Sequence, residues 1–394
     1  VMYGWLPVPL HFKVPHGIHL IEATAVAVDS EGNCYCFNRG NIPVLVFDPE
    51  GNLLRHWGNP TPFEGSEVVT DPYGNTAMRF KGIEFRRAHA ITIDHEDNVW
   101  LVDDSAHAIT KCDRFGKRLM MLIPPRLSSD ADAPDQVDTL CVLTDVEDMR
   151  AATGIVHQAP PKHSGLRFNR PTDVAVHPTT GEIFVSDGYG NSCVHRLSAT
   201  GEHISTWGRP GTGPGEFNLP HSIAIDTATD TVVVADRESS RLQFFALDGT
   251  YLKQWFVHRA TAVDVVGGLI YAAEQGSKSL VQRGGGPADL DSWVPNIGNC
   301  VGVYRANDDT PSGNRLTRIG AATGSERPDA FIFPHSLAVT ADGRSLYVAE
   351  VSFCECGRHQ KPHAREMTSL RLWRRVDGGG DVSGGGDGIG VARV

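Results

Sequence analysis

The chain has 394 residues, including 42 glycines and 24 prolines, and 40% of its residues are hydrophobic, which is typical of a soluble globular protein rich in turns. Its 36 basic and 47 acidic residues leave a formal net charge of -11, which argues against a nucleic-acid partner and against binding to an anionic membrane surface. No apolar run approaches the roughly 18 residues that a membrane-spanning helix needs.

A repeated unit fills most of the chain. Each copy contains an apolar stretch, a turn, a β-rich run that ends in an acidic or amide residue, and a further strand. Alternating apolar residues between Gly, Asp and Asn turns indicate short antiparallel strands. The copies lie, in chain order, at residues 24–58, 89–122, 172–208, 221–256, 261–284 and 335–353. Units of about 35–45 residues with several strands each are typical of propeller blades, so the sequence predicts an all-β fold, a six-bladed β-propeller.

The predicted propeller forms one domain over residues 1–376, with two long insertions. The first lies near residues 124–168, before the third unit, and the second near residues 285–330, before the sixth. The remaining residues, 377–394, are rich in glycine, so we expect a flexible tail.

The position that opens the innermost strand alternates between two residue types. The second, fourth and sixth units carry His89, His221 and His335, whereas the other three units carry Thr24, Thr172 and Thr261. Alternate blades of a six-membered ring lie about 120° apart, and equivalent positions on the innermost strands face the central channel at similar height. The three histidines can therefore converge on one point. Three imidazoles with an open fourth position form a catalytic zinc site, and the alternative is that they simply line the channel as polar residues.

A second position, just after the next strand of each unit, also faces the channel. It carries Arg39 in the first unit, Tyr189 beside Asp187 in the third, and Arg237 in the fourth. Arginine can bind a carboxylate through two parallel hydrogen bonds, so two arginines beside a metal suit a small carboxylate-bearing substrate. A tyrosine there can act as a general base when neighbouring cations favour its ionised form. The alternative is that the aspartate caps a turn and the arginines are solvated.

At these residues the chain resembles the catalytic core of the peptidyl-α-hydroxyglycine α-amidating lyases, which are six-bladed propellers of the NHL-repeat type. The resemblance is strongest over residues 169–241, which include NRPTDVAVHPTTGEIFVSDGYGNS, GPGEFNLPHSIAID and VADRESSR. It implies that His89, His221 and His335 are zinc ligands. It also implies that Tyr189 is the catalytic tyrosine and that Arg39 and Arg237 are active-site arginines.

The chain departs from the family's pattern at two positions. The family has an aspartate that ligates a structural calcium directly after its third zinc histidine, and here that residue is Ser336, so calcium is in doubt. The family's cysteine after the catalytic tyrosine is Gly190 here, so the corresponding disulfide is absent. We expect no monooxygenase domain to accompany the predicted lyase, and the two insertions match nothing in the family's pattern.

The leading hypothesis is a zinc-dependent lyase that cleaves the C–N bond of an α-hydroxyglycine-type compound, an amidoglycolate or a ureidoglycolate-like molecule. The products would be an amide and glyoxylate or a related carbonyl acid. Two rivals remain open. One is a metal-dependent hydrolase of the lactonase kind, although such sites rely on carboxylate ligands, and the other is a non-enzymatic NHL scaffold that binds a partner.

Two weaker signals complete the sequence. The cluster formed by Cys354, Cys356, His359 and His363 offers metal-binding side chains, but its spacing fits no standard zinc pattern well. The first residues lack the basic and apolar regions of a signal peptide, so we expect a cytoplasmic location.

Overall fold

The computed structural model describes residues 4–20, 22–58, 85–124, 167–276, 298–321, 328–351 and 369–376, and the backbone of three further strands. These strands are β6 (Glu67–Thr70) and β7 (Thr76–Arg79), which pair as a hairpin, and β12 (Cys141–Leu143). No helix in this part of the chain combines the length and apolarity that crossing a membrane requires. The glycine-rich tail and the Cys354–His363 cluster lie outside the described residues.

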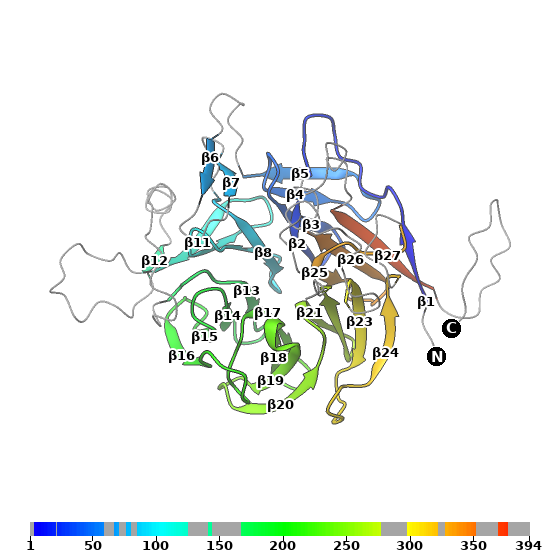
Figure 1. Ribbon diagram of the computed structural model, residues 1–394. Coiled ribbons are helices and arrows are strands. Elements are labelled where there is room, and N and C mark those ends of the chain that lie inside the picture. Colours follow the sequence, from blue (N-terminus) through cyan, green and yellow to red (C-terminus); the bar gives the residue numbers. More distant parts are fainter. Residues whose placement is uncertain are drawn as a thin grey trace, which may run out of the picture.

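Six antiparallel sheets stand as blades around a central axis (Figure 1), which confirms the predicted six-bladed β-propeller. The first blade contains β2 (Ala23–Val28), β3 (Cys34–Asn38), β4 (Val44–Phe47) and β5 (Leu53–Trp57). The second contains β8 (Ala88–Ile93), β9 (Val99–Asp103), β10 (Ala108–Cys112) and β11 (Arg118–Ile123), and β12 pairs with the outer edge of β11. The third blade contains β13 (Asp173–Val176), β14 (Ile183–Asp187), β15 (Cys193–Leu197) and β16 (His203–Trp207). The fourth contains β17 (Pro220–Asp226), β18 (Thr231–Asp236), β19 (Arg241–Ala246) and β20 (Tyr251–Phe256), and the short 3-10 helix η1 (Arg237–Ser239) follows β18.

The fifth blade corrects one sequence prediction. It contains β21 (Ala260–Val266), β22 (Leu269–Glu274), β23 (Cys300–Arg305) and β24 (Arg315–Ile319). The predicted insertion near residues 285–330 therefore contains two blade strands. The error arose because residues 277–297, which lie outside the described part of the chain, separate β22 from β23 and hide the repeat.

The sixth blade closes the ring with strands from both parts of the sequence. It contains β25 (Pro334–Val339), β26 (Ser345–Glu350) and β27 (Leu370–Val376), and its outermost strand is β1 (Gly4–Val8), which pairs antiparallel with β27. The innermost strands contact one another in the order β2, β8, β13, β17, β21 and β25, and β25 contacts β2 again. The sequence pattern did not predict β1, because a single half-exposed strand of five residues carries little periodic signal.

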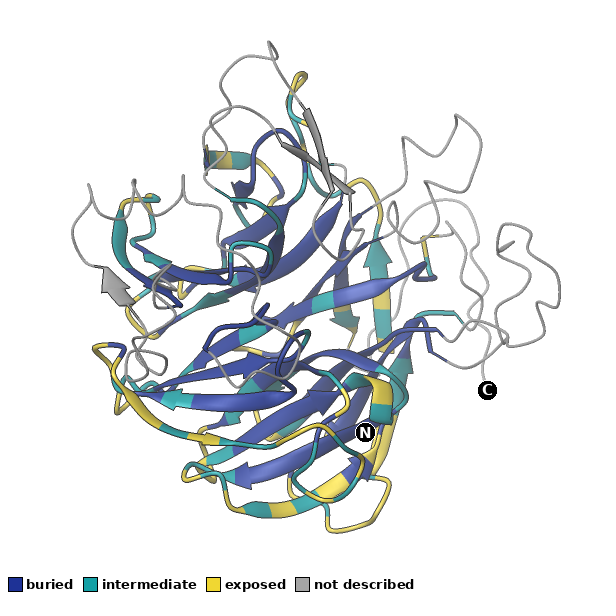
Figure 2. Cartoon of the chain, turned by 60° about the vertical axis from the view of Figure 1, so that its left-hand side comes forward, coloured by how far each residue is buried: buried dark blue, intermediate teal, exposed yellow. Residues whose placement is uncertain are grey.

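The core lies between the faces of neighbouring blades (Figure 2). The second strand of a blade is buried on both faces, whereas outer strands such as β5 and β20 alternate between half-buried and exposed positions, because only one face meets another blade. Tryptophans near the ends of three outer strands pack on turn glycines of the next blade, where a Cβ atom would collide with the indole ring: Trp57 on Gly116, Trp207 on Gly249 and Trp255 on Gly313.

Two of the three threonines that open innermost strands tie neighbouring blades together through their hydroxyl groups. The Thr172 hydroxyl donates to the carbonyl of Pro220 at 2.7 Å, and the Thr261 hydroxyl donates to the carbonyl of Pro334 at 2.9 Å. Both threonines are buried, so each hydroxyl satisfies a carbonyl that water does not reach.

We expect Thr261→Val to lower the free energy of unfolding by about 1–3 kcal/mol, because it keeps the side-chain shape but leaves buried carbonyl groups without their donor. The matched control is Thr231→Val at the partly exposed start of β18, which should change the free energy by no more than about 0.5 kcal/mol. Urea denaturation of both variants checks this, and equal effects would contradict the assignment.

Candidate functional site

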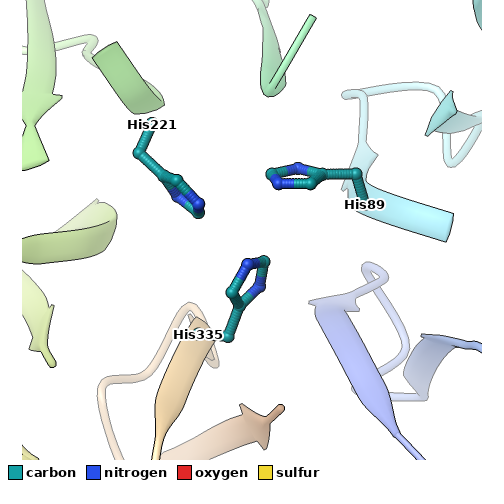
Figure 3. Close-up of side chains that lie close together, drawn as sticks. All are labelled: His89, His221 and His335. Carbon is teal, nitrogen blue, oxygen red and sulfur yellow. The ribbon is translucent and has the colours of Figure 1, made fainter. Parts of the chain in front are cut away.

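His89, His221 and His335 are the second residues of β8, β17 and β25 and lie around the central axis. Their ring centroids are 4.8–5.0 Å apart, and one ring nitrogen from each lies within 4.8 Å of those of the other two. Figure 3 shows the three imidazoles pointing toward one another. The structure thus brings together the three histidines that the sequence singled out, and all three are buried.

A backbone carbonyl from the next blade orients each imidazole. The Nδ1 atoms of His89, His221 and His335 lie 2.6, 2.7 and 2.7 Å from the carbonyl oxygens of Thr172, Thr261 and Thr24. A carbonyl oxygen only accepts hydrogen bonds, so each Nδ1 must carry the proton and donate it. The Nε2 atoms of the neutral rings then present their lone pairs toward the axis, which is the tautomer that a metal ligand requires.

The surroundings favour the neutral form of all three imidazoles. Burial lowers the pKa of His335 to about 3, and the nearby Arg39 charge adds to this effect. Burial also holds the pKa of His89 and that of His221 well below the usual range. Arg237 is the next largest cause at His221, and His335 is the next largest at His89. Three neutral, buried and pre-oriented nitrogen donors fit a divalent ion such as zinc.

Tyr189 lies in the turn between β14 and β15 and reaches the same centre. Its hydroxyl oxygen is 3.0 Å from His89 Nε2 and 3.2 Å from His221 Nε2, and its ring meets both imidazoles edge to face. The preceding Gly188 is required by close packing, because a Cβ atom there would collide with the carbonyl oxygen of Pro220. A phenol group therefore stands at the point where the histidine nitrogens converge.

The two predicted arginines lie within electrostatic reach of the histidines, and each pairs with a carboxylate. Arg39 follows β3, where its Nη1 is 2.9 Å from Glu22 Oε2 and its Nε donates to the carbonyl of Ala88 at 3.2 Å. Arg237 begins η1, and its Nε is 2.8 Å from Glu238 Oε1. The rim of the site thus carries two positively charged guanidinium groups, and their acidic neighbours fix the orientation of each.

Sequence reasoning missed a second group of charges beside Tyr189. The Arg170 guanidinium carbon lies 4.8 Å from the centroid of the tyrosine ring, and Arg170 Nη2 pairs with Asp104 Oδ2 at 2.7 Å. The same carboxylate oxygen pairs with Arg87 Nη1 at 3.0 Å. Asp104 and Arg170 come from different blades, so no repeat within the sequence links them. The only available signal was position: Arg87 and Arg170 lie shortly before innermost strands, and Asp104 directly follows the second strand of its blade.

A cavity of about 290 Å³ extends from the histidines along the central channel between the innermost strands. Two carboxylates, Asp173 and Asp264, line it, together with Ser222 and Ser336. The Ser336 hydroxyl accepts the backbone N–H of Val26 at 3.2 Å. Ser336, where the family has a calcium-ligating aspartate, is therefore used here in a hydrogen bond between blades.

A further cluster of potential metal ligands among the described residues is Asp187, Cys193 and His195, all buried. The contacts of this cluster indicate a structural role, in which it fixes a loop to the third blade. Both carboxylate oxygens of Asp187 accept the backbone N–H of Asn169 in the loop before β13, and Oδ2 lies 3.1 Å from His195 Nε2. In the fourth blade, the equivalent Asp236 accepts a backbone N–H and pairs with Arg241 at 2.9 Å. The same role is thus filled by an arginine in one blade and by a histidine in the other.

Comparison with known proteins finds propeller and lyase relatives. Residues 169–267 match a family model described as a 6-bladed beta-propeller. The chain is 30% identical over 240 residues to peptidylglycine alpha-amidating monooxygenase of Rattus norvegicus, covering 59% of this chain and 21% of that protein. It is 27% identical over 351 residues to peptidyl-alpha-hydroxyglycine alpha-amidating lyase 1 of Drosophila melanogaster, covering 86% and 56%. It is 30% identical over 240 residues to NHL repeat-containing protein 3 of Homo sapiens, covering 58% and 54%.

These relatives confirm the resemblance to the amidating lyases and to NHL-repeat proteins, and the family model agrees with the six blades. The chain spans 21% of the length of the rat monooxygenase and 56% of the length of the fly lyase.

The cavity acid Asp173 gives a pH dependence that can be measured. Burial, with a contribution from the Asp264 charge, raises the pKa of Asp173 to about 7, whereas the pKa of an aspartate in the unfolded chain is about 3.9. The stabilising contribution of its proton is therefore complete below about pH 4 and is lost as the pH rises through about 7. We expect the stability of Asp173→Asn relative to the wild type to improve from about pH 5 to about pH 8 in urea denaturation. A difference that does not change with pH would contradict the assignment.

Proposed function

We propose that this protein is a metal-dependent carbon–nitrogen lyase that acts on an α-hydroxyglycine-type substrate. The observation that carries the proposal is the convergence of three buried imidazoles, with the Tyr189 hydroxyl 3.0 Å and 3.2 Å from two of their Nε2 atoms. The names of the amidating relatives support the same reaction class.

His89, His221 and His335 would hold the metal, and zinc is the ion that suits three neutral imidazoles best. When bound, zinc would supply Lewis acidity that favours loss of the proton from the substrate's α-hydroxyl group. Calcium has no part in the proposal, because the neutral Ser336 hydroxyl is a poorer calcium ligand than a carboxylate.

Tyr189 is the proposed general base. Its phenolate oxygen takes the proton of the α-hydroxyl group, the electron pair of that O–H bond forms the carbonyl of glyoxylate, and the C–N bond breaks. The electron pair of the broken bond stays on the nitrogen, which takes the proton back from the Tyr189 hydroxyl to give an amide. Base and acid are then one residue, so the proton is conserved over the cycle.

Arg39 and Arg237 supply the positive charges that a carboxylate-bearing substrate requires. Arg39, fixed by Glu22, would hold the substrate carboxylate, and Arg237, fixed by Glu238, would support the tyrosinate form of Tyr189. The substrate class is an amidoglycolate or a ureidoglycolate-like molecule, because both contain a carboxylate and a nitrogen on the hydroxylated carbon.

One specific observation favours a second candidate, a binding scaffold without catalysis. The chain is 30% identical over 240 residues to NHL repeat-containing protein 3, whose name states no reaction, and it has the same identity over the same length to the rat monooxygenase. A scaffold has no need of a metal. The lactonase-type hydrolase has less support, because the converging group in the described residues contains histidines and no carboxylate.

We expect the purified protein to contain about one zinc ion per chain and no retained calcium, because one centre of three histidines is available. His221→Ala should lose most of the zinc and the activity. The control is His203→Ala on the exposed face of outer strand β16, which should retain both. Elemental analysis checks the metals. A wild-type protein without zinc would favour the scaffold, and calcium retained through dialysis would contradict the role given to Ser336.

We expect Tyr189→Phe to keep the fold and the zinc but to release glyoxylate about 10²–10⁴-fold more slowly, because only the hydroxyl is lost. Arg39→Ala should act mainly by raising KM, because its contact with the carboxylate exists before and during bond cleavage. Steady-state kinetics over hydroxyglycine derivatives measures both. Tyr189→Phe protein that holds zinc and turns over at the wild-type rate would rule out the mechanism.

A further inference from the structure

We propose that Arg170, held by Asp104, is the residue that positions Tyr189 for catalysis. This inference rests on the proposed function, because it assigns a role to a residue that acts through the proposed general base.

Arg170 contacts Tyr189 through both its side chain and its backbone. The guanidinium carbon lies 4.8 Å from the centroid of the tyrosine ring, on its face, while the imidazoles of His89 and His221 meet the ring edge to face. The Arg170 carbonyl accepts the backbone N–H of Tyr189 at 3.4 Å. The guanidinium thus covers the face of the phenol, and the residue that supplies it also binds the tyrosine backbone. The phenol hydroxyl lies beside two imidazoles.

Asp104 fixes the guanidinium in place. It follows β9, its side chain is fully buried, and its Oδ2 lies 2.7 Å from Arg170 Nη2 and 3.0 Å from Arg87 Nη1. Burial alone would raise the pKa of Asp104, but the charges of Arg87 and Arg170 bring it below its usual range. The carboxylate stays ionised and orients Arg170, so a planar cation lies across the ring rather than in the solvent.

The backbone of Arg170 points to a constrained position. Its φ angle of 62° lies in the left-handed region, which is costly for a residue with a side chain, and His107 Nδ1 accepts its backbone N–H at 3.0 Å. A conformation of this kind persists only where surrounding contacts determine it. Here those contacts come from the second blade, and they set the side chain over the face of Tyr189.

A cation over an aromatic face is attracted by the negative electrostatic potential of that face, so the guanidinium holds the Tyr189 ring in its observed orientation. Arg170 would therefore keep the phenol oxygen beside the two imidazoles, where the proposed reaction needs it. This positioning acts on turnover and does not act on the carboxylate that the substrate presents to Arg39.

The test is Arg170→Met, which keeps the length of the side chain and removes the cation. Asp104 stays paired with Arg87 in this variant. We expect kcat to fall about 5- to 30-fold, with KM unchanged within about twofold and with wild-type zinc content and Tm. Arg170→Lys restores a cation and should recover most of the loss. The control is Arg196→Met in the third blade, whose guanidinium lies 6.0 Å from the Phe184 ring and pairs with Glu182 at 2.8 Å. Its kcat should equal that of the wild type.

A double-mutant cycle separates positioning from a structural role. If Arg170 acts through the Tyr189 hydroxyl, Arg170→Met should have no further effect on kcat in a Tyr189→Phe background. The same fold-loss in both backgrounds, a rise in KM alone, or wild-type kcat in Arg170→Met would each overturn the inference. If Tyr189→Phe alone keeps wild-type turnover, the proposed function fails instead, which distinguishes the two failures.

Discussion

The hydrogen bond from a histidine Nδ1 to a threonine carbonyl of the next blade is the interaction on which the centre of this molecule depends. It occurs three times, at 2.6–2.7 Å, and each time it joins an even-numbered blade to the following odd-numbered one. It sets the tautomer of each ring and aims the other nitrogen at the axis. In the third and fifth blades, the hydroxyl of the same threonine donates a hydrogen bond to the carbonyl of the proline that precedes the next histidine. Where the second blade has alanine in place of that proline, the carbonyl of Ala88 is bound by Arg39 instead.

A second recurring feature explains how the rim of the site is built. In three blades the second strand ends in a buried acid or amide that accepts a loop N–H: Asn38 accepts that of Gly40 in the loop that follows, whereas Asp187 and Asp236 accept those of Asn169 and Asn218 in the loops before their blades. The residues proposed for chemistry follow directly: Arg39 is one residue after Asn38, and Arg237 one residue after Asp236. Tyr189 is two residues after Asp187. A carboxylate or amide that anchors the loop thus also fixes the starting point of a functional side chain.

The parts of the site that repeat from blade to blade could be predicted from the sequence. The alternation of histidine and threonine located the converging imidazoles, and the shared register located Tyr189, Arg39 and Arg237. What could not be predicted depends on contacts between blades. Asp104 and Arg170 are 66 residues apart and meet only because the second and third blades are neighbours. Glu238 is next to Arg237 in the sequence, whereas Glu22 is next to Arg39 only in space. No periodic pattern distinguishes either glutamate from a solvent-exposed acid. For the fold, the six blades followed from the repeat, whereas β1 and the β23–β24 pair did not.

The pairing of β1 with β27 also sets an order of events. Among the described strands, β1 is the earliest in the sequence and pairs with β27, the latest, so β1 lacks this partner until residues near 376 have been synthesised. The three histidines come from alternate blades, so no two adjacent blades contain more than one of them. His335 belongs to the same blade that β1 completes. A propeller synthesised only as far as β24 therefore lacks one of the three imidazoles, and the metal binding that we propose would be a late event that follows the addition of the sixth blade.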